Sequence, residues 1–560
     1  MPDRQRWAGL VVIGLAVSLV VVDITIVNVT IPAIVADLGI SAGEVQWVHE
    51  AYTLLFAALL LVFGRLGDCV GRRRMLLIGV VVFAVASAVA TQADSGGPLI
   101  TARVLQGVGG AAIFPVTLSL INATFIGRER GTAFAVWGST IAAMAALGPL
   151  LGGWLTTAFS WRWAFGINVP LAAIVVVGTL LLIGESRDRE SGRGADVVGA
   201  TLAAVSTALL VFALIEGREL GWLAALHPEI FGLPWRVPIS PVLLALTGSV
   251  GGALLFLALE RHRAATGRVV LLDLSLFAIP TFRWGTATAL VVALGEFGIL
   301  FALPLWLQNA MGYSALQTGV VLLPFAVASL IAGGVGGSIA VARGGGTAVR
   351  LGLMFEVIGM VGIGLVIAEG TPWWLLVPTL AVYGFGVGLS SAQLGNVALA
   401  DVPARASGQA SGIQTTSQQI GSALGIAVLG TVLFTTLGSG FDDRLDDAGM
   451  ATGDRVALVT AVEESAGGVV PALAENPATA AVADDAREAV AASTRTAAFT
   501  AAGFLVFGLL TSLRLESEPG VGPHPTTRRT RPNPRNGPNR NRPNRRSRLR
   551  QTEPDQLRAG

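Results

Sequence analysis

The chain has 560 residues, of which 53% are hydrophobic and 13% are charged, and its mean hydropathy is +0.67. Because soluble domains carry roughly 25% charged residues, this composition excludes an ordinary soluble protein. The 38 basic residues are all arginine, and the formal net charge is only +2. The single cysteine, Cys69, excludes a disulfide framework and a cysteine-rich metal centre, so we expect no metal site.

Apolar segments follow one another along the whole chain, each near the ~20 residues that a helix needs to cross a bilayer. The first continues past residue 20 without a small-residue cleavage site, so we interpret it as an uncleaved helix. The predicted fold class is an all-α polytopic membrane protein with fourteen transmembrane helices. The segments lie near 8–30, 47–63, 75–92, 98–123, 132–157, 163–183, 196–215, 239–258, 285–308, 316–341, 350–368, 374–396, 411–436 and 495–513.

Arginines and acidic residues alternate between successive loops. Arginines collect in every second loop, for example at Arg128 and Arg130, whereas the long stretch 437–493 is rich in acids. Since arginine marks cytoplasmic loops, we expect both termini in the cytoplasm, 437–493 outside, and a multi-pass protein of the cell membrane. The Pro- and Arg-rich tail, 516–560, is expected to be disordered and attracted to anionic lipid.

Two ionisable residues lie inside the first and fourth segments. Asp23 is an intramembrane acid, and such residues usually face a cavity and mark a pathway. The alternative is a structural role, hydrogen-bonded to Thr25 or Asn28. Arg103 stays protonated, so it needs an anion or carbonyl oxygens around it. A nearby cation favours the charged form of Asp23 and burial favours the neutral form, so a conformational change that tilts this balance would let Asp23 carry a proton.

A dense charged stretch, 64–74, lies between the second and third apolar segments. It is predicted to be a short loop at the cytoplasmic face, in which glycines permit a sharp turn and arginines keep Asp68 ionised. Its spacing suggests a cytoplasmic latch rather than a substrate site. The latch residues are expected to be Gly64, Asp68, Gly71 and Arg72.

Glycine and proline interrupt the fifth segment. Pro149 breaks the hydrogen-bond ladder of a helix, and its neighbour Gly148, with Gly152 and Gly153, leaves room for another helix. This pattern favours a hinge or a close helix contact between two halves of the protein. The alternative is a kink that faces lipid.

Two internal sequence similarities suggest a duplicated unit. The glycines at the two ends of 64–71 recur at the two ends of 337–344, and at nearly the same offset the sequence at 130–133 resembles that at 407–410. The second copy lacks most of the charges, since Val341 stands where the first copy has an aspartate. The predicted units are a six-helix half over 1–185, an inserted helix pair over 186–283, a second six-helix half over 284–515 and the tail over 516–560.

The second half has acids of its own. Glu296 and Glu356 could meet a cationic substrate in a central cavity, or equally could lie near an interface or snorkel. Aromatic side chains such as Phe301 and Trp306 could stack on a flat substrate, although most membrane aromatics serve packing. The candidate cavity residues are Asn28, Glu296, Phe301, Trp306 and Glu356.

Five motifs in order make the chain resemble the fourteen-helix drug:proton antiporters of the major facilitator superfamily over nearly its whole length. One departure is Met144, where the exporter signature on helix 5 often begins with glycine. The motifs are 64–74, 99–110 with Arg103 and Gln106, 148–153, the set Asp23, Thr25, Asn28 and Pro32, and 161–165 with Asn168 and Pro170.

The resemblance implies a major facilitator fold and export of hydrophobic, often cationic compounds in exchange for protons, with Asp23 and Arg103 in proton coupling. We expect no enzymatic activity and no cofactor, and the absence of a Gly-x-x-x-x-Gly-Lys motif argues against a built-in ATPase. The expected partners are a small-molecule substrate, protons and membrane lipid, with no nucleic acid and a monomeric state. The alternatives are a dedicated exporter of one natural product, as in antibiotic self-resistance, a proton-coupled importer, and a non-transporting membrane sensor or scaffold.

Overall fold

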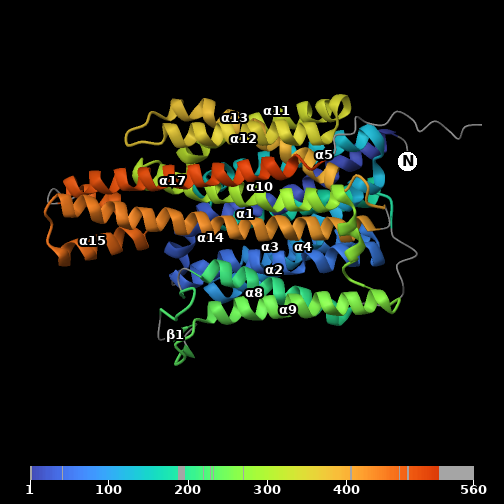
Figure 1. The fold of residues 1–560 in the computed structure, drawn as a ribbon, viewed down its shortest axis with the longest axis horizontal. Coiled ribbons are helices and arrows are strands. Elements are labelled where there is room, and N and C mark those ends of the chain that lie inside the picture. Colours follow the sequence, from blue (N-terminus) through green and yellow to red (C-terminus); the bar gives the residue numbers. More distant parts are fainter. Residues whose placement is uncertain are drawn as a thin grey trace, which may run out of the picture. The chain divides into compact units, whose positions relative to one another are not determined.

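The computed structural model describes residues 3–40, 42–186, 196–217, 220–226, 229–230, 233–268, 270–403, 406–465, 467–475 and 479–515. The side chains of Asn28 and Phe301 and the tail 516–560 lie outside the described part. The described chain is almost entirely helical (Figure 1). Its strands are a two-residue antiparallel pair, β1 (Glu229–Ile230) and β2 (Leu233–Pro234), between two helices.

The first part of the chain forms a helical bundle around two neighbouring apolar cores. Tyr52, Phe83 and Phe134 belong to the larger core, and Ile26 and Phe165 to the smaller one. All five side chains are fully buried. The helices are α1 (Asp3–Leu38), α2 (Ala42–Val70), α3 (Arg72–Ala90), α4 (Gly96–Thr124), α5 (Gly127–Ala158), α6 (Arg162–Gly166) and α7 (Asn168–Leu182).

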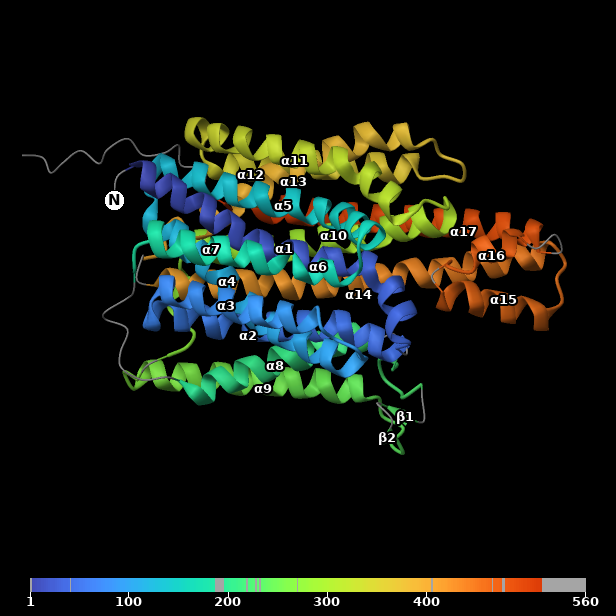
Figure 2. The same cartoon turned by 180° about the vertical axis from the view of Figure 1, so that it is seen from behind.

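A helix pair follows this bundle. The helices α8 (Val197–Glu216) and α9 (Pro241–Ala265) pack on each other, and α8 packs on α2. They lie side by side along one edge of the molecule (Figures 1 and 2). The 3-10 turn η1 (Leu274–Ala278) then leads into the next bundle.

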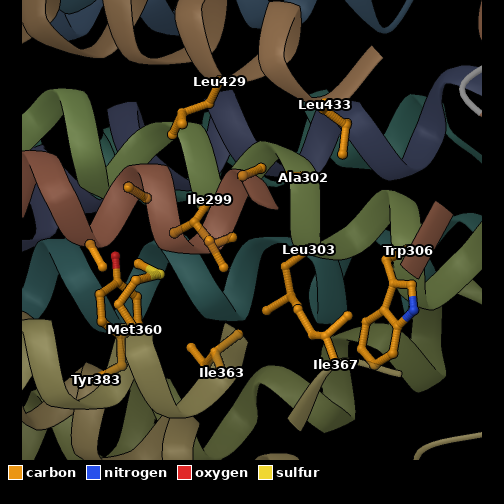
Figure 3. Close-up of a cluster of buried hydrophobic side chains, with 14 of the residues drawn as sticks. Ile299, Ala302, Leu303, Trp306, Met360, Ile363, Ile367, Tyr383, Leu429 and Leu433 are labelled. Atoms are coloured by element: carbon orange, nitrogen blue, oxygen red, sulfur yellow. The ribbon is translucent and has the colours of Figure 1, made fainter. Parts of the chain in front are cut away.

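The second bundle surrounds a third apolar core, to which Ile299, Trp306, Met360 and Tyr383 contribute (Figure 3). Its elements at the start are α10 (Pro280–Leu305), the π-helical turn η2 (Trp306–Ala310), α11 (Ala315–Arg343), α12 (Gly345–Val366) and α13 (Trp373–Ala398). Its remaining elements are α14 (Ser407–Asp447), α15 (Thr452–Glu464), α16 (Val470–Glu475) and α17 (Ala480–Ser512).

The membrane character of the chain is confirmed by its helices. Among the described residues, 12 helices are long and apolar enough to cross a bilayer, or 13 if the bent helix α5 is one span. The shorter apolar helix Val198–Leu214, within α8, falls below that length. The predicted number of fourteen therefore remains a prediction.

The charged stretch 64–74 is not a loop, and that prediction is wrong. Helix α2 continues to Val70 and α3 begins at Arg72, so the turn is confined to Gly71, whose φ of 121° and ψ of 131° favour glycine. One residue in this conformation redirects the backbone, and no longer loop is needed. Asp68 is consequently a buried helical residue.

The acidic stretch 437–493 is largely helical over its described residues rather than an extended loop. Helix α14 continues to Asp447 because Leu437, Phe441 and Leu445, spaced four residues apart, place one apolar face against the core. In both views α14, α15 and α17 extend beyond the other helices at one end (Figures 1 and 2). Sequence hydropathy alone does not reveal this extension, since the exposed face is acidic.

The internal sequence similarities correspond to equivalent helix contacts. Gly107 on α4 packs against the backbone of Tyr52 on α2, and Gly384 on α13 packs against the backbone of Phe325 on α11. Gly107 and Gly384 are separated by the same number of residues as the similar stretches 130–133 and 407–410. Tyr52 and Phe325 are separated by the same number of residues as 64–71 and 337–344. The glycine between α11 and α12 has a positive φ of 88°, as the glycine between α2 and α3 does in the first bundle. The two bundles thus repeat the same packing.

Candidate functional site

A buried ion pair lies inside the first bundle. The guanidinium of Arg103 on α4 donates from Nη1 to Oδ2 of Asp23 on α1 at 2.5 Å, and both side chains are 0% exposed. The two residues predicted as the proton-coupling pair are therefore in direct contact. Breaking a buried pair by removing one partner leaves an uncompensated charge in a dry interior, which is costly.

Three neutral polar residues complete this site. Gln106 on α4 donates to Oδ1 of Asp23 at 2.9 Å, and Asn168 on α7 donates to the same atom at 2.8 Å. Both amides also donate to Ser87 on α3, at 2.8 and 3.3 Å. The carboxylate of Asp23 is thereby tied to α3, α4 and α7. Motif reading pointed to Gln106 and Asn168 without giving them a role, and it missed Ser87.

Other contacts of Arg103 reach α2 and α6, besides a hydrogen bond from its Nη1 to Gln106 on α4 at 2.9 Å. Its Nε donates to the carbonyl of Val48 at 2.9 Å, and the guanidinium lies 4.4 Å from the ring centre of Tyr52 and 5.9 Å from that of Phe165. Aromatic faces stabilise a cation that has left water. Its Nη2 is buried without a hydrogen-bond partner. Arg103 thus connects the ion pair to α2 and α6.

A second contact site, here called the latch, joins α2 to α14. The carboxylate of Asp68 accepts hydrogen bonds from the backbone N–H groups of Gly408 at 3.1 Å and Gln409 at 2.9 Å, in the first turn of α14. Arg72 donates to Asp68 at 2.7 Å and to Ser407 at 2.7 Å. An anion at a helix N-terminus satisfies free N–H groups and complements the helix dipole.

Glycine permits this approach of α2 to α14. A Cβ atom on Gly64 would lie 2.7 Å from the carbonyl oxygen of Gly408 and 2.9 Å from the Cα atom of Gly412. The four predicted latch residues therefore have distinct positions. Gly64 lies against α14, Asp68 and Arg72 bind its first turn, and Gly71 makes the bend.

A second connection between the bundles lies at the start of α5. Arg130 donates to Asn396 on α13 at 3.0 Å, and Gln393 donates to the carbonyl of Gly131 at 3.0 Å. The repeat relates the start of α5 to the start of α14, and it relates Asp68 on α2 to Val341 on α11. The second connection therefore has no acid in the position of Asp68.

Helix α5 bends just before the residues predicted as a hinge. Its two parts, Glu129–Ala145 and Leu147–Ala158, meet at 41° just before Pro149. Gly148 and Gly152 pack closely against α1 of the same bundle. Of these glycines, Gly153 faces the second bundle, where a Cβ atom on it would lie 3.7 Å from Leu316 on α11. This part of α5 therefore contacts both bundles, since Leu150 also lies against Gly319 on α11.

The acids of the second bundle come together inside it. Glu296 on α10 and Glu356 on α12 interact electrostatically and are 8% and 0% exposed. Trp306 is fully buried in the apolar core, with an unpartnered Nε1. All three side chains are buried in this structure, and their place in a substrate cavity remains a prediction. The side chains of Asn28 and Phe301 lie outside the described part.

The far end of α1 carries an ion pair of a different kind. Asp37 accepts hydrogen bonds from Arg162 at 2.6 Å and from the indole of Trp161 at 3.0 Å, and its side chain is half-exposed. Arg162, and then Trp161, hold the pKa of Asp37 below its usual value. This carboxylate provides an accessible counterpart to the buried Asp23 on the same helix.

Apolar spans that enclose an ion pair define a multi-pass membrane protein with a polar site in its interior, the usual arrangement of a transporter. Residues 13–426 match the Major Facilitator Superfamily, and the chain belongs to this superfamily. The resemblance predicted from the motifs is confirmed. Membership makes the protein a membrane transporter rather than an enzyme.

Several relatives are named as exporters. The chain is 37% identical over 456 residues to the probable actinorhodin transporter of Streptomyces coelicolor, covering 80% of this chain and 75% of that protein. It is 34% identical over 488 residues to the multidrug efflux pump LfrA of Mycolicibacterium smegmatis, covering 87% and 91%. It is 32% identical over 476 residues to the multidrug resistance protein Stp of Mycobacterium tuberculosis, covering 84% of each chain.

Solved structures share the fold. The human organic anion transporter MFSD10 superposes with a TM-score of 0.57 and 14% identity, covering 91% of this chain and 100% of that one. A bacterial homologue of the human lysosomal transporter Spinster has a TM-score of 0.50 and 16% identity, covering 93% and 100%. At these identities the likeness concerns the fold alone.

Proposed function

We propose that the protein is a proton-coupled antiporter that exports hydrophobic or cationic small molecules across the cell membrane. The observation that carries this proposal is the fully buried pair of Asp23 and Arg103 with its polar neighbours. A carboxylate held at this depth is a proton carrier whose two charge states differ strongly in their interactions. Relatives named as drug and antibiotic exporters support the direction of transport.

The coupling step follows from the contacts of the pair. A proton that binds Asp23 removes the negative charge to which Arg103 donates, while the arginine keeps its own charge. Arg103 then loses this charged acceptor, and its hydrogen bond to α2 and its ring contact with α6 make the resulting change a movement of helices. Protonation of one carboxyl group thereby biases the bundle between two arrangements.

The two arrangements differ in whether the latch is closed or open. We infer that Asp68, Arg72 and Gly64 hold the first and second halves together at the cytoplasmic end, and that they separate when the cavity opens inward. The bend before Pro149 in α5 is the proposed hinge. Alternating access then consists of closing and opening this contact around a central substrate path.

The proposed topology has both termini in the cytoplasm and residues 437–493 outside, because arginines and acids segregate between alternate loops. The two halves are residues 1–185 and 284–515, with an inserted pair between them. In this orientation the Arg-rich tail meets the anionic inner leaflet. We expect a monomer that binds protons, lipid and a small-molecule substrate, and requires no cofactor.

A second candidate is a dedicated exporter of one natural product. The specific support is the similarity to the probable actinorhodin transporter, at 37% identity. The purified protein in proteoliposomes with a pH-sensitive dye inside distinguishes the two. An exporter releases protons from the acidic lumen when a substrate is added outside. A multidrug exporter responds to several unrelated cationic compounds, and a dedicated one to a single chemical class. The absence of any response across a broad panel, with wild-type folding, would contradict both.

A further inference from the structure

Glu296 occupies in the second bundle the position that Asp23 occupies in the first. The offset between them equals that between 64–71 and 337–344, and both side chains lie inside their bundles. The partner acid is placed by the repeat as well. On α4 and α13, equivalent glycines pack against the backbones of Phe83 and Glu356, so Glu356 stands where the first bundle has Phe83. At these two equivalent positions, the second bundle has two buried acids and the first has one.

The arginine of the first bundle has no counterpart here. At the offset that relates α4 to α13, Leu380 stands at the position of Arg103, and Tyr383 stands at the position of Gln106. Tyr383 is 1% exposed, and its hydroxyl is buried without a hydrogen-bond partner. It interacts electrostatically with both buried acids. Figure 3 shows this side chain beside Met360 within the apolar core.

Each acid has one hydroxyl neighbour and one unsatisfied oxygen. The hydroxyl of Ser390 donates to Oε1 of Glu356, and the adjacent Ser391 interacts with Glu296. Oε1 of Glu296 and Oε2 of Glu356 are buried without partners. A carboxylate has no proton to donate, whereas a carboxylic acid has one. The free oxygens are thus arranged for a site that holds a proton.

Charges on the neighbouring elements do not compensate this pair. Among the described residues, Tyr383 on α13 is the titratable side chain that interacts with both acids. The acids of α14 and α17 lie near the ends of those helices, at 442–447 and 484–488. The arginines on the surrounding elements are exposed or bonded elsewhere: Arg343 and Arg495 are exposed, Arg350 donates to Gly346, Arg444 pairs with Glu488, and Arg487 pairs with Asp484.

We propose that Glu296 and Glu356 form a second proton-binding site, in which at least one of the two buried carboxyl groups inside the second bundle holds a proton. Glu296 and Glu356 interact electrostatically in a dry interior, where two carboxylates repel each other, and neither has a cation to offset its desolvation. The pair therefore titrates as a unit, and its protons belong to both residues. The proton moves on and off a carboxyl oxygen, and no other bond changes.

This site does not depend on the proposed transport cycle, because it concerns the resting protein. Infrared spectroscopy of the purified full-length protein in nanodiscs at neutral pH tests it directly. Ordinary carboxyl groups are ionised under these conditions, so a deuterium-sensitive C=O band of a protonated carboxyl group reports an unusual site. The band is expected in the wild type and in the exposed-acid control Glu369→Gln. It should be lost in the double variant Glu296→Gln/Glu356→Gln.

Two further measurements keep the proposal testable. The variants Tyr383→Phe and Ser390→Ala retain both acids and should shift the band without removing it. In an acid titration, the double variant should bind about one proton fewer per molecule than the wild type near neutral pH. An unchanged band and an unchanged proton count in the folded double variant would overturn the proposal. Asp23→Asn should leave the band intact, so failure of this site and failure of the proposed antiport are separate results.

Discussion

The Oδ2 atom of Asp68 lies 2.9 Å from the backbone nitrogen of Gln409, although 341 residues separate the two in sequence. This contact joins α2 of the first bundle to the first turn of α14 in the second. The carboxylate also accepts from Gly408 and pairs with Arg72, and it is fully buried. One side chain thus holds the connection that the proposed transport cycle must open.

Replacement of Asp68 should impair the latch without changing the substrate site. Asp68→Asn removes the negative charge from the start of α14 and places an amide donor beside backbone donors. We expect slower conformational exchange and slower turnover, with equilibrium substrate affinity close to that of the wild type. Single-molecule distance measurements between labels on α2 and α14 give the exchange rate. Asp94→Asn, an exposed acid, is the matched control. A large loss of affinity with unchanged turnover would show that Asp68 serves the substrate site instead.

The glycine contact offers a steric test of the same latch. Gly64→Ala would place a methyl group against the backbone of Gly408 and Gly412, which cannot move aside as a side chain can. The closed arrangement should become less populated, so that a cysteine introduced on the facing surface reacts faster with a thiol reagent in a Cys69→Ser background. Gly334→Ala on α11, where nothing lies within 4 Å, should leave the rate unchanged. Equal rates in all three proteins would exclude a close α2–α14 contact.

The buried ion pair should contribute to stability in a recognisable way. Arg103→Ala leaves the carboxylate of Asp23 buried without its cation, and the expected loss is about 3–5 kcal/mol in the free energy of unfolding. Adding Asp23→Asn to Arg103→Ala should recover part of that loss, since the uncompensated charge is gone. The exposed Arg495→Ala provides the control in α17. Losses that simply add in the double variant would mean that the two groups do not interact.

The sequence identified the charged residues of the site more readily than the neutral ones. Asp23 and Arg103 stand out because isolated charges in apolar helices are expensive. Ser87 did not, since serine in a helix usually bonds to its own backbone and gives no distinctive pattern. The pairing of Asp68 with Gln409 was not predictable from local spacing, because tertiary packing alone brings the two helices together. Gly71 was expected at a turn, but the sequence did not predict that this single residue would form the whole turn.

The topology is open to a direct chemical test. Thr460→Cys and Arg540→Cys, each in a Cys69→Ser background, are treated in intact cells with a thiol reagent that cannot cross the membrane. Labelling is expected at 460 and not at 540, because the acidic stretch 437–493 is proposed to be outside and the tail inside. Membranes opened with detergent give the reference labelling at both sites. Labelling at 540 in intact cells would require an odd number of spans and would contradict the proposed two halves.

The account as a whole depends on Asp23 as the group that couples proton movement to export. Asp23→Asn keeps the shape of the side chain but cannot exchange a proton, and Asp37→Asn alters a half-exposed acid on the same helix. Both variants and the wild type are reconstituted into proteoliposomes, where transport driven by a pH gradient is compared with exchange of labelled for unlabelled substrate.

The account predicts that Asp23→Asn loses transport driven by the pH gradient and retains substrate exchange, whereas Asp37→Asn retains both. Gradient-driven transport at the wild-type rate in folded Asp23→Asn would contradict it.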